Sequence, residues 1–253
     1  MKRIFVIAGT EDGRELAVFL LSKGFDVTAS VVSNYGRELL ERHVGLKINA
    51  RKLDAAELST YLDTHAIEVV VDASHPYAAN VSRNALEVCR AKKIPCIRYE
   101  RKEVELTYEK IHRVANYEAA ADCAARLGKN IFLTTGSRSL KTFVERLVDS
   151  NVIARVLPTS DVIADCERLG LTPKQIVAMQ GPFSRELNVA MFRQFRAEVI
   201  VTKNSGSIGG VDEKIAAASE LNLPIVMIDR PKIAFDNIAE SFDGVLEFIA
   251  ELG

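Results

Sequence analysis

The chain has 253 residues, of which 48% are hydrophobic and 26% are charged, the composition of an ordinary soluble globular protein. Its formal net charge of −1 gives no general attraction to nucleic acid or to an anionic membrane, so we expect neither as a partner. The longest apolar runs are too short to span a bilayer. Any anion that the protein binds must therefore be held by local arginine and lysine side chains.

The cysteines and histidines predict neither a disulfide framework nor a metal site. The four cysteines form no C-x-x-C pair, and the four histidines form no H-E-x-x-H pattern. We expect reduced cysteines that pack inside a cytoplasmic protein, and no metal. The first nine residues are basic and then apolar, like a signal peptide, but they run directly into a turn motif, which favours a first β-strand.

Short β-branched runs alternate with longer amphipathic stretches along the chain, a pattern typical of a parallel sheet covered by helices. In the first part, the pattern predicts strands at 3–8, 26–32, 46–50, 68–72 and 96–99, and helices at 12–23, 34–43, 54–64 and 77–92. In the second part, it predicts strands at 130–133, 151–155, 175–179, 198–202 and 224–228, and helices at 116–127, 138–148, 160–168, 184–195, 211–221 and 237–252. The fold class is therefore α/β, with two Rossmann-like halves joined near residue 100.

In an open parallel sheet, ligands bind at the carboxyl ends of the strands. The first strand runs into Gly9-Thr-Glu-Asp-Gly-Arg14, where two glycines permit a tight turn and the close approach of a phosphate to a helix N-terminus. The motif is not G-x-G-x-x-G. Nucleotide binding is one interpretation, and a plain turn with Thr10 as helix cap is the other.

Other strand ends of the first half are also polar. The second strand ends without an acid that could accept the ribose hydroxyls of NAD, whereas Ser33 and Arg37 could hold the 2′-phosphate of NADP. The alternative is a surface serine and a solvated arginine. Ser74 and His75 follow the fourth strand and are candidates to face the crevice, although a lone histidine is more often structural or exposed than catalytic.

Arg98 and Arg101 flank the end of the next strand. Two arginines there could bind carboxylates in bidentate geometry, and a solvated charge run is the alternative.

The second half has four further motifs at strand ends. They are Leu133-Thr-Thr-Gly-Ser-Arg138, Ile153-Ala-Arg-Val-Leu-Pro158, Met179-Gln-Gly-Pro-Phe-Ser184 and Val201-Thr-Lys-Asn-Ser-Gly206. In the last motif Lys203 precedes the glycines, whereas the lysine of a nucleoside-triphosphate loop follows them. The order of residues therefore excludes that kind of phosphate loop.

Together and in this order, the segments 9–14, 72–78, 98–101, 134–138, 155–158, 180–184 and 202–206 resemble the precorrin-6A reductases of cobalamin synthesis, including the enzymes that take cobalt-precorrin-6A. The resemblance runs from about residue 5 to about residue 232. It implies a cytoplasmic reductase with a nucleotide-binding domain at 1–100, a substrate domain at 101–253 and the active site in the cleft between them. Hydride would pass from NADPH, or from NADH, to a ring double bond of precorrin-6A or cobalt-precorrin-6A, giving the 6B form.

The resemblance also implies roles for individual residues. The catalytic candidates are Lys203, Asn204 and Ser205. The cofactor-binding candidates are Gly9, Thr10, Glu11, Gly13, Arg14, Ser33, Arg37, Ser74 and His75. The substrate-binding candidates are Tyr77, Arg98, Arg101, Thr135, Gly136, Ser137, Arg138, Arg155, Gln180, Gly181 and Ser184.

Lys203 is the expected electrostatic stabiliser or acid of the reaction. Some members of the family carry Asp where this chain has Asn204, and an amide cannot donate a proton as a carboxylic acid does. The proton donor is therefore expected to be Lys203 or water.

Two other function classes stay open on the sequence. One is a cofactor-free tetrapyrrole lyase or synthase, against which the glycine turn at 9–13 argues. The other is a non-catalytic NAD(P)-sensing module, which leaves the arginines of the second half unexplained. We expect a small-molecule corrin precursor as the partner, and a monomer or a weak homodimer.

Overall fold

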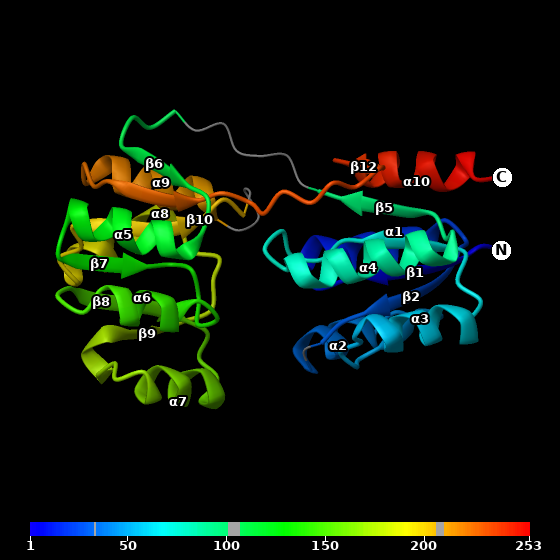
Figure 1. Ribbon diagram of the computed structural model, residues 1–253, viewed down its shortest axis with the longest axis horizontal. Helices are drawn as coiled ribbons and strands as arrows, with labels where there is room; N and C mark the ends of the chain where they lie inside the picture. The colour runs from blue at the N-terminus through cyan, green and yellow to red at the C-terminus, as the bar shows by residue number, and fades with distance from the viewer. Residues whose placement is uncertain (33, 101–106, 206–209) are drawn as a thin grey trace. The chain divides into compact units, whose positions relative to one another are not determined.

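The computed structural model describes residues 1–32, 34–100, 107–205 and 210–253, and the chain divides into two compact units (Figure 1). Unit 1 comprises Met1–Lys102 and Pro231–Gly253, and unit 2 comprises Glu103–Arg230. Each unit has its own parallel sheet and its own hydrophobic core. The expected α/β class with two Rossmann-like halves is confirmed.

The sheet of unit 1 has six strands in the spatial order β12-β5-β4-β1-β2-β3, and every pairing is parallel. Read from the other edge, this is the 3-2-1-4-5-6 order of a doubly wound nucleotide-binding fold. The strand order reverses between β1 and β4, so the carboxyl ends of these two strands form the switch point. The strands are β1 (Arg3–Ile7), β2 (Asp26–Ser30), β3 (Lys47–Asn49), β4 (Val69–Asp72), β5 (Cys96–Tyr99) and β12 (Ile238–Ala239).

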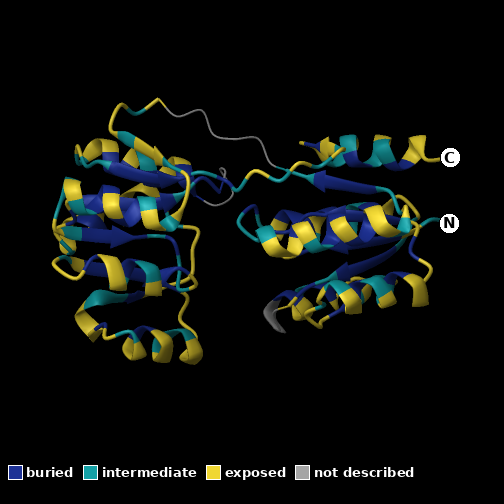
Figure 2. Ribbon diagram, viewed as in Figure 1, coloured by how far each residue is buried: buried dark blue, intermediate teal, exposed yellow. Residues whose placement is uncertain are grey.

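Helices cover both faces of this sheet. Successive side chains of a strand point to opposite faces, so Ile4 and Val6 pack on one side and Phe5 and Ile7 on the other. The first side is covered by α1 and α10, and the second by α3 and α4. Figure 2 shows the buried strands between helices whose outward faces are exposed. The helices are α1 (Glu11–Ser22), α2 (Asn34–Leu40), α3 (Ala55–Thr64), α4 (Ala79–Lys92) and α10 (Phe242–Glu251).

The sheet of unit 2 has the spatial order β6-β11-β10-β7-β8-β9, again with parallel pairings throughout. If β7 is counted as the first strand, this is the same 3-2-1-4-5-6 arrangement, with the sixth position filled by a strand that comes first in the chain. The switch point lies between β7 and β10. The strands are β6 (Ile111–Val114), β7 (Asn130–Leu133), β8 (Asn151–Val156), β9 (Ile176–Ala178), β10 (Val199–Lys203) and β11 (Ile225–Ile228).

The core of unit 2 centres on aromatic and aliphatic side chains beneath α8 and α9. Phe132 of β7 lies edge-on to Phe192 of α8, with 5.2 Å between the ring centroids. On α5 and α6, Tyr117 and Phe143 meet edge to face. The helical elements are α5 (Tyr117–Leu127), α6 (Leu140–Arg146), α7 (Ser160–Arg168), the 3₁₀ turn η1 (Pro173–Gln175), α8 (Arg185–Gln194) and α9 (Val211–Glu220).

The structure corrects the expected boundary between the two halves. The sequence predicts that everything after residue 100 forms the second domain, but residues 231–253 belong to unit 1. Ile238 pairs with Arg98 at the edge of the unit 1 sheet, and Val245 and Ile249 of α10 are buried in the unit 1 core. The predicted helix at 237–252 therefore contains a strand, β12, before α10 begins at Phe242.

Two of the four edge strands, β6 and β12, are not predicted by the sequence pattern, and the reason is the same for both. β6 reads Ile-His-Arg-Val and β12 has two residues, so neither forms an apolar β-branched run. Both occupy sheet edges, where one side of the strand faces no partner and polar residues are tolerated.

Three further findings concern the whole described chain. Among the described residues, no helix is long and apolar enough to cross a membrane, and no group of His, Cys, Asp or Glu could hold a metal ion. All four cysteines are buried free thiols.

Candidate functional site

In unit 1, the turn between β1 and α1 lies at the switch point of the sheet. The Thr10 hydroxyl accepts a hydrogen bond from the Gly13 N–H at 3.1 Å and donates one to the Ala73 carbonyl at 3.1 Å. A Cβ added at Gly13 would lie 2.7 Å from that carbonyl oxygen, so glycine lets α1 pack directly against the loop after β4. At Gly9, which is exposed, the nearest atom to an added Cβ is 4.0 Å away. Thr10 caps the helix, as in the second interpretation of the motif, and the backbone at Gly9 leaves space for a ligand.

The loop between β4 and α4 is organised by a buried ion pair. Arg98 Nη1 lies 2.9 Å from Asp72 Oδ1, and both side chains are almost completely buried. The same guanidinium donates to the Ser74 hydroxyl at 3.1 Å, and Asp72 Oδ1 accepts from the Ser74 N–H at 2.9 Å. The sequence predicts that Arg98 binds substrate, but the structure places its guanidinium inside unit 1, because Asp72 needs a buried counter-charge.

His75 and Tyr77, which follow this ion pair, are half-buried. The Tyr77 N–H donates to His75 Nδ1 at 3.2 Å, and the two rings lie 5.7 Å apart. A neutral imidazole whose Nδ1 accepts carries its proton on Nε2. His75 is thus held in one tautomer at the switch point of unit 1.

The remaining cofactor candidates lie around α1 and the end of β2. Glu11 is exposed and Arg14 half-buried in the first turns of α1. Arg37 is exposed and forms an ion pair with Glu41 one helical turn away, at 2.6 Å. Ser33 and Arg101 lie outside the described residues.

In unit 2, four cationic side chains come together near the carboxyl ends of the strands. Lys203 ends β10, Arg138 follows β7, Arg155 lies in β8 and Lys214 lies in α9. Burial, with the charge of Arg138, lowers the pKa of Lys203 to about 8. Burial, with the charges of Arg155 and Lys203, lowers the pKa of Lys214 to about 7. Such mutual effects require the charges to be close, so the four residues form one region of positive potential, here called the cation cluster.

Arg155 of the cation cluster is held by side chains of the loop before α8 and of α8 itself. Its Nη1 donates to Asn188 Oδ1 at 2.7 Å, and its guanidinium lies 4.2 Å from the Phe183 ring centroid. Only 5% of the residue is exposed, and burial lowers its pKa to about 10, so it remains charged at neutral pH. Asn188 donates in turn to the Ser184 carbonyl at 2.9 Å, which ties the arginine to the start of α8.

Lys203 is followed by a tight backbone turn that contains the other two catalytic candidates. The Asn204 N–H donates to the Ile228 carbonyl at 3.1 Å, and its own carbonyl accepts from Arg230 Nε at 2.9 Å. The Ser205 N–H donates back to the Lys203 carbonyl at 2.9 Å. Asn204 and Ser205 are both buried, so they lie beside Lys203 in a fixed backbone conformation.

The turn after β7 brings Thr135, Gly136 and Ser137 to the unit 2 switch point. Gly136 has a positive φ of 78°, a conformation that suits glycine. Thr135 is buried and accepts a hydrogen bond from the Ser139 hydroxyl at 3.3 Å, while the Ser137 carbonyl accepts from the Leu140 N–H. These contacts hold the turn after β7 against the start of α6.

Gln180 and Gly181 are exposed in the loop between β9 and α8, and Ser184 caps α8 by accepting from the Leu187 N–H at 3.3 Å. A Cβ at Gly181 would come within 2.9 Å of the Phe183 ring, so this glycine lets the ring reach Arg155.

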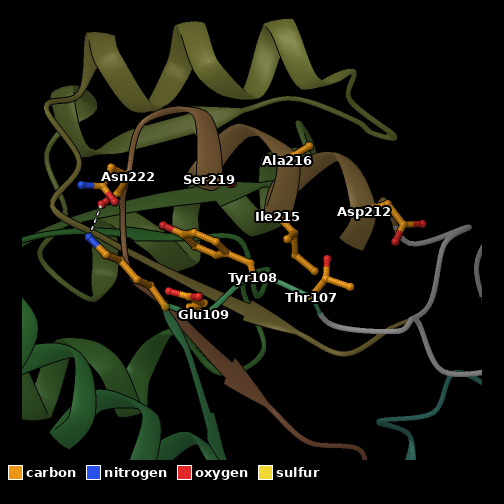
Figure 3. Close-up of a pocket in the computed structure, with 9 residues that line it drawn as sticks. Thr107, Tyr108, Glu109, Asp212, Ile215, Ala216, Ser219 and Asn222 are labelled. Atoms are coloured by element: carbon orange, nitrogen blue, oxygen red, sulfur yellow. Dashed lines mark hydrogen bonds between the residues drawn. The ribbon is translucent and has the colours of Figure 1, made fainter.

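A pocket of about 450 Å³ lies elsewhere on unit 2, between α9 and the segment that precedes β6 (Figure 3). Lys110 and Asn222 meet at one end of it through a 3.3 Å hydrogen bond from Lys110 Nζ to the Asn222 carbonyl. None of the four residues of the cation cluster lines this pocket. The switch point with the cation cluster is therefore the stronger candidate site, because it is where an α/β sheet binds its ligands.

Sequence reasoning missed Lys214 and Asp72. Lys214 lies three residues after Val211 and four before Ala218, both of which are buried, so it falls on the apolar face of α9. That spacing could have revealed it. Asp72 is the last residue of the apolar run Val-Val-Val-Asp, and an acid at the end of a buried strand is a signal for a buried partner.

The family model described as Precorrin-6x reductase CbiJ/CobK matches residues 3–250. The chain belongs to this family. The cobalt-precorrin-6A reductase of Priestia megaterium is 41% identical over 246 residues, with 96% of each chain covered. The enzyme of the same name from Methanothermobacter thermautotrophicus is 34% identical and covers 99% of this chain and 85% of its own. A solved structure of CobK precorrin-6A reductase is 25% identical, covers 100% and 98% of the two chains, and superposes with a TM-score of 0.80.

Membership in the precorrin-6x reductases confirms the resemblance read from the motifs. The protein is an oxidoreductase of cobalamin biosynthesis that acts on a ring carbon–carbon bond and uses a reduced nicotinamide cofactor. Unit 1 fits such a cofactor, because Gly9 leaves open space at the switch point and Gly13 lets the N-terminus of α1 come close to it. Neither the cofactor-free lyase nor the sensing module is supported.

Proposed function

We propose that the protein transfers a hydride from NADPH to one ring double bond of cobalt-precorrin-6A, giving the 6B form. The family match over nearly the whole chain carries this proposal. Six relatives that are 30–41% identical to the chain are named cobalt-precorrin-6A reductase, whereas two that are 31% and 26% identical are named precorrin-6A reductase. These identities favour the cobalt-containing substrate over the metal-free one.

In this proposal unit 1 binds the nucleotide. The pyrophosphate lies over Gly9, Thr10 and Gly13, where N–H groups at the start of α1 attract an anion. Glu11, Arg14, Ser74 and His75 complete the surroundings of the cofactor. Arg98 acts by holding the loop of Ser74 in place rather than by touching a ligand.

NADPH is proposed rather than NADH because β2 ends without the acid that NAD-binding sheets place there. Ser33 and Arg37 are the proposed contacts of the 2′-phosphate. Arg37 would exchange its exposed pairing with Glu41 for the phosphate, at little cost, because exposed ion pairs contribute only about 0–1 kcal/mol.

Unit 2 binds the macrocycle, whose rim carries acetate and propionate groups. Arg138 and Arg155 are the proposed carboxylate contacts, since arginine can bind a carboxylate through two parallel hydrogen bonds. Arg101 and Tyr77 remain proposed substrate contacts. Thr135, Gly136, Ser137, Gln180, Gly181 and Ser184 shape the rim of the site.

The bound nicotinamide supplies the hydride, and a proton must reach the other carbon of the reduced bond. Lys203 is the proposed source of that proton or of the positive field, with Asn204 and Ser205 positioning the ring. The lowered pKa of Lys203, about 8, leaves it mostly protonated at neutral pH yet able to donate.

We further infer a cytoplasmic protein that is a monomer or a weak homodimer. The four buried free thiols suit a reducing compartment. Size-exclusion chromatography with light scattering would determine the oligomeric state.

The test is to titrate the purified protein with NADPH and with NADH, and then to add cobalt-precorrin-6A or precorrin-6A while following the absorbance of the reduced nicotinamide. We expect oxidation of NADPH only when the macrocycle is present, and faster with the cobalt form. Failure to bind either nucleotide would refute the proposed reaction. Faster oxidation of NADH, or faster turnover of the metal-free macrocycle, would refute the corresponding choice of cofactor or substrate.

A further inference from the structure

Each unit buries an arginine in a β-strand, and the two arginines have partners of different charge. Arg98 of β5 is 4% exposed and Arg155 of β8 is 5% exposed. Arg98 Nη1 lies 2.9 Å from a carboxylate oxygen of Asp72. Arg155 Nη1 donates to the amide oxygen of Asn188 at 2.7 Å, and its one other acceptor in the part of the chain that the structure describes is the Met191 sulfur, at 3.9 Å. Within these residues the charge of Arg155, unlike that of Arg98, therefore has only neutral partners.

Asn188 fixes the guanidinium of Arg155 in place. It is the fourth residue of α8 and only 1% exposed. Its Nδ2 donates to the Ser184 carbonyl at 2.9 Å and to the Phe183 carbonyl at 3.3 Å, while its Oδ1 accepts from the arginine. An amide can accept on one side and donate on the other, which a carboxylate cannot do. The Phe183 ring covers the guanidinium, whose carbon lies 4.2 Å from the ring centroid. Arg155 is thus held in position without being neutralised.

This arrangement is unfavourable for folding alone. Burial lowers the pKa of Arg155 to about 10, because the guanidinium loses its hydration, and the side chain still keeps its charge at neutral pH. A methionine would fill much of the same space without that cost. A bound anion reverses the balance, since the attraction between opposite charges is screened little by water in a buried site. Both contacts of Arg155 with described acceptors are made by Nη1, so the edge formed by Nε and Nη2 can bind a carboxylate through two parallel hydrogen bonds.

We propose that Asn188 is a positioning residue of the substrate site, which holds Arg155 so that its Nε–Nη2 edge binds a carboxylate of the macrocycle. Because Asn188 is neutral, the positive charge of Arg155 is left for the substrate. The inference rests on the proposed function, in which Arg155 is a carboxylate contact, and it adds a residue of α8 that acts through this arginine. It follows that a negative charge at position 188 weakens substrate binding more than the loss of the amide does.

The test compares the wild type with Asn188→Asp, which keeps the size of the side chain and places a carboxylate against the guanidinium. The matched control is Asn151→Asp, which adds the same charge at an exposed position at the other end of β8. With NADPH saturating, we expect the KM for cobalt-precorrin-6A to rise roughly 10- to 100-fold in Asn188→Asp, the loss expected for one charged hydrogen bond, and to stay unchanged in the control. The kcat should stay within about threefold of wild type, and the NADPH affinity should be unchanged, because the lost contact is uniform binding of the substrate.

A double-mutant cycle separates positioning from a merely structural role. Asn188→Asp should raise the KM when Arg155 is present, and it should have no further effect when it is combined with Arg155→Met, because Asn188 acts only through the arginine. Asn188→Ala, which removes the acceptor but adds no charge, should give a KM between those of the wild type and Asn188→Asp. Circular dichroism on all variants checks that the fold is intact, and if Asn188→Asp does not fold, the same cycle is measured with Asn188→Ala.

An unchanged KM in folded Asn188→Asp would overturn the inference, and so would a rise in KM that persists in the Arg155→Met background. Loss of NADPH affinity in place of substrate affinity would also overturn it, because the anion bound by Arg155 would then be a phosphate of the cofactor. If the wild type fails to oxidise NADPH with the macrocycle, the proposed function fails. Titration of the macrocycle alone by its visible absorbance, in the wild type and in Asn188→Asp, then still decides whether Asn188 controls its binding.

Discussion

Replacing Lys214 by methionine should stabilise the folded protein. The pKa of Lys214 is lowered from 10.5 to about 7, first by burial and then by the charges of Arg155 and Lys203. At ~1.36 kcal/mol for each pKa unit, this difference corresponds to roughly 5 kcal/mol as an upper limit. Structural relaxation and water penetration reduce such penalties, so we expect Lys214→Met to raise the free energy of unfolding by about 1–3 kcal/mol near neutral pH.

The pH dependence of this effect has a definite sign. Above about pH 7 the folded protein releases the Lys214 proton, whereas the unfolded chain keeps it up to about pH 10.4. The unfolded state therefore binds more protons in this range, and the stability of the wild type rises with pH between the two values. Lys214→Met has no titrating group at this position, so its free energy of unfolding should rise less steeply with pH than that of the wild type. The difference in the free energy of unfolding between the variant and the wild type should be greatest at or below about pH 7 and should shrink toward pH 10.

Hydrogen exchange is the appropriate assay, because the protein has two units and a single unfolding midpoint would mix them. Exchange rates in peptides from β10 and α9 measure the stability of unit 2. Exchange rates in peptides from β1 and β4 serve as the internal control in unit 1. Faster exchange in the β10 and α9 peptides of Lys214→Met, with an unchanged pH profile, would refute the reasoning. It would mean that the folded protein already stabilises the charge of Lys214.

Three further predictions concern the glycine turn, the buried ion pair and Lys203. Gly13→Ala should destabilise unit 1 by about 1–3 kcal/mol, because its Cβ would lie 2.7 Å from a backbone oxygen. Gly9→Ala, with 4.0 Å of space, should leave hydrogen exchange in unit 1 unchanged while it raises the KM for NADPH. Equal exchange rates in unit 1 of the two variants would contradict this reasoning. Arg98→Met should lower the stability of unit 1 by about 3–5 kcal/mol, measured by hydrogen exchange in peptides from β1 and β4, because Asp72 would keep a buried charge without its ion-pair partner. A loss below about 1 kcal/mol would show that Asp72 is compensated in another way. The kcat/KM of the wild type for the macrocycle should fall as the pH rises through about 8, where Lys203 of the free protein loses its proton. A profile that Lys203→Met leaves unshifted would remove Lys203 from the proton transfer.

Much of the fold could be predicted from sequence because it depends on local patterns. All ten strands that the periodicity predicts are present, since strands buried on both faces are apolar throughout and stand out from amphipathic helices. β6 and β12 could not be predicted in this way, because edge strands need no continuous apolar run. The position of residues 231–253 depends on the pairing of β12 with β5, a contact between segments about 140 residues apart.

The candidate site was predictable to the extent that it lies at strand ends. Gly9, Gly13 and Lys203 could be chosen as candidates because a switch point needs glycine turns and polar residues in known places. The ion pair of Arg98 could not be predicted, since nothing in its immediate neighbours shows that Asp72, on another strand, lies against its guanidinium.

The sequence by itself determined the α/β class, the family and the strand-end residues, because periodicity and ordered motifs are properties of neighbouring positions. Only the tertiary structure decided which charges meet. In the folded protein Arg98 lies against Asp72 inside unit 1. Lys214 of α9 is buried where the charges of Arg155 in β8 and Lys203 in β10 affect its pKa. Charge–charge energies depend on distance and burial, and both are set by the packing of segments far apart in the chain.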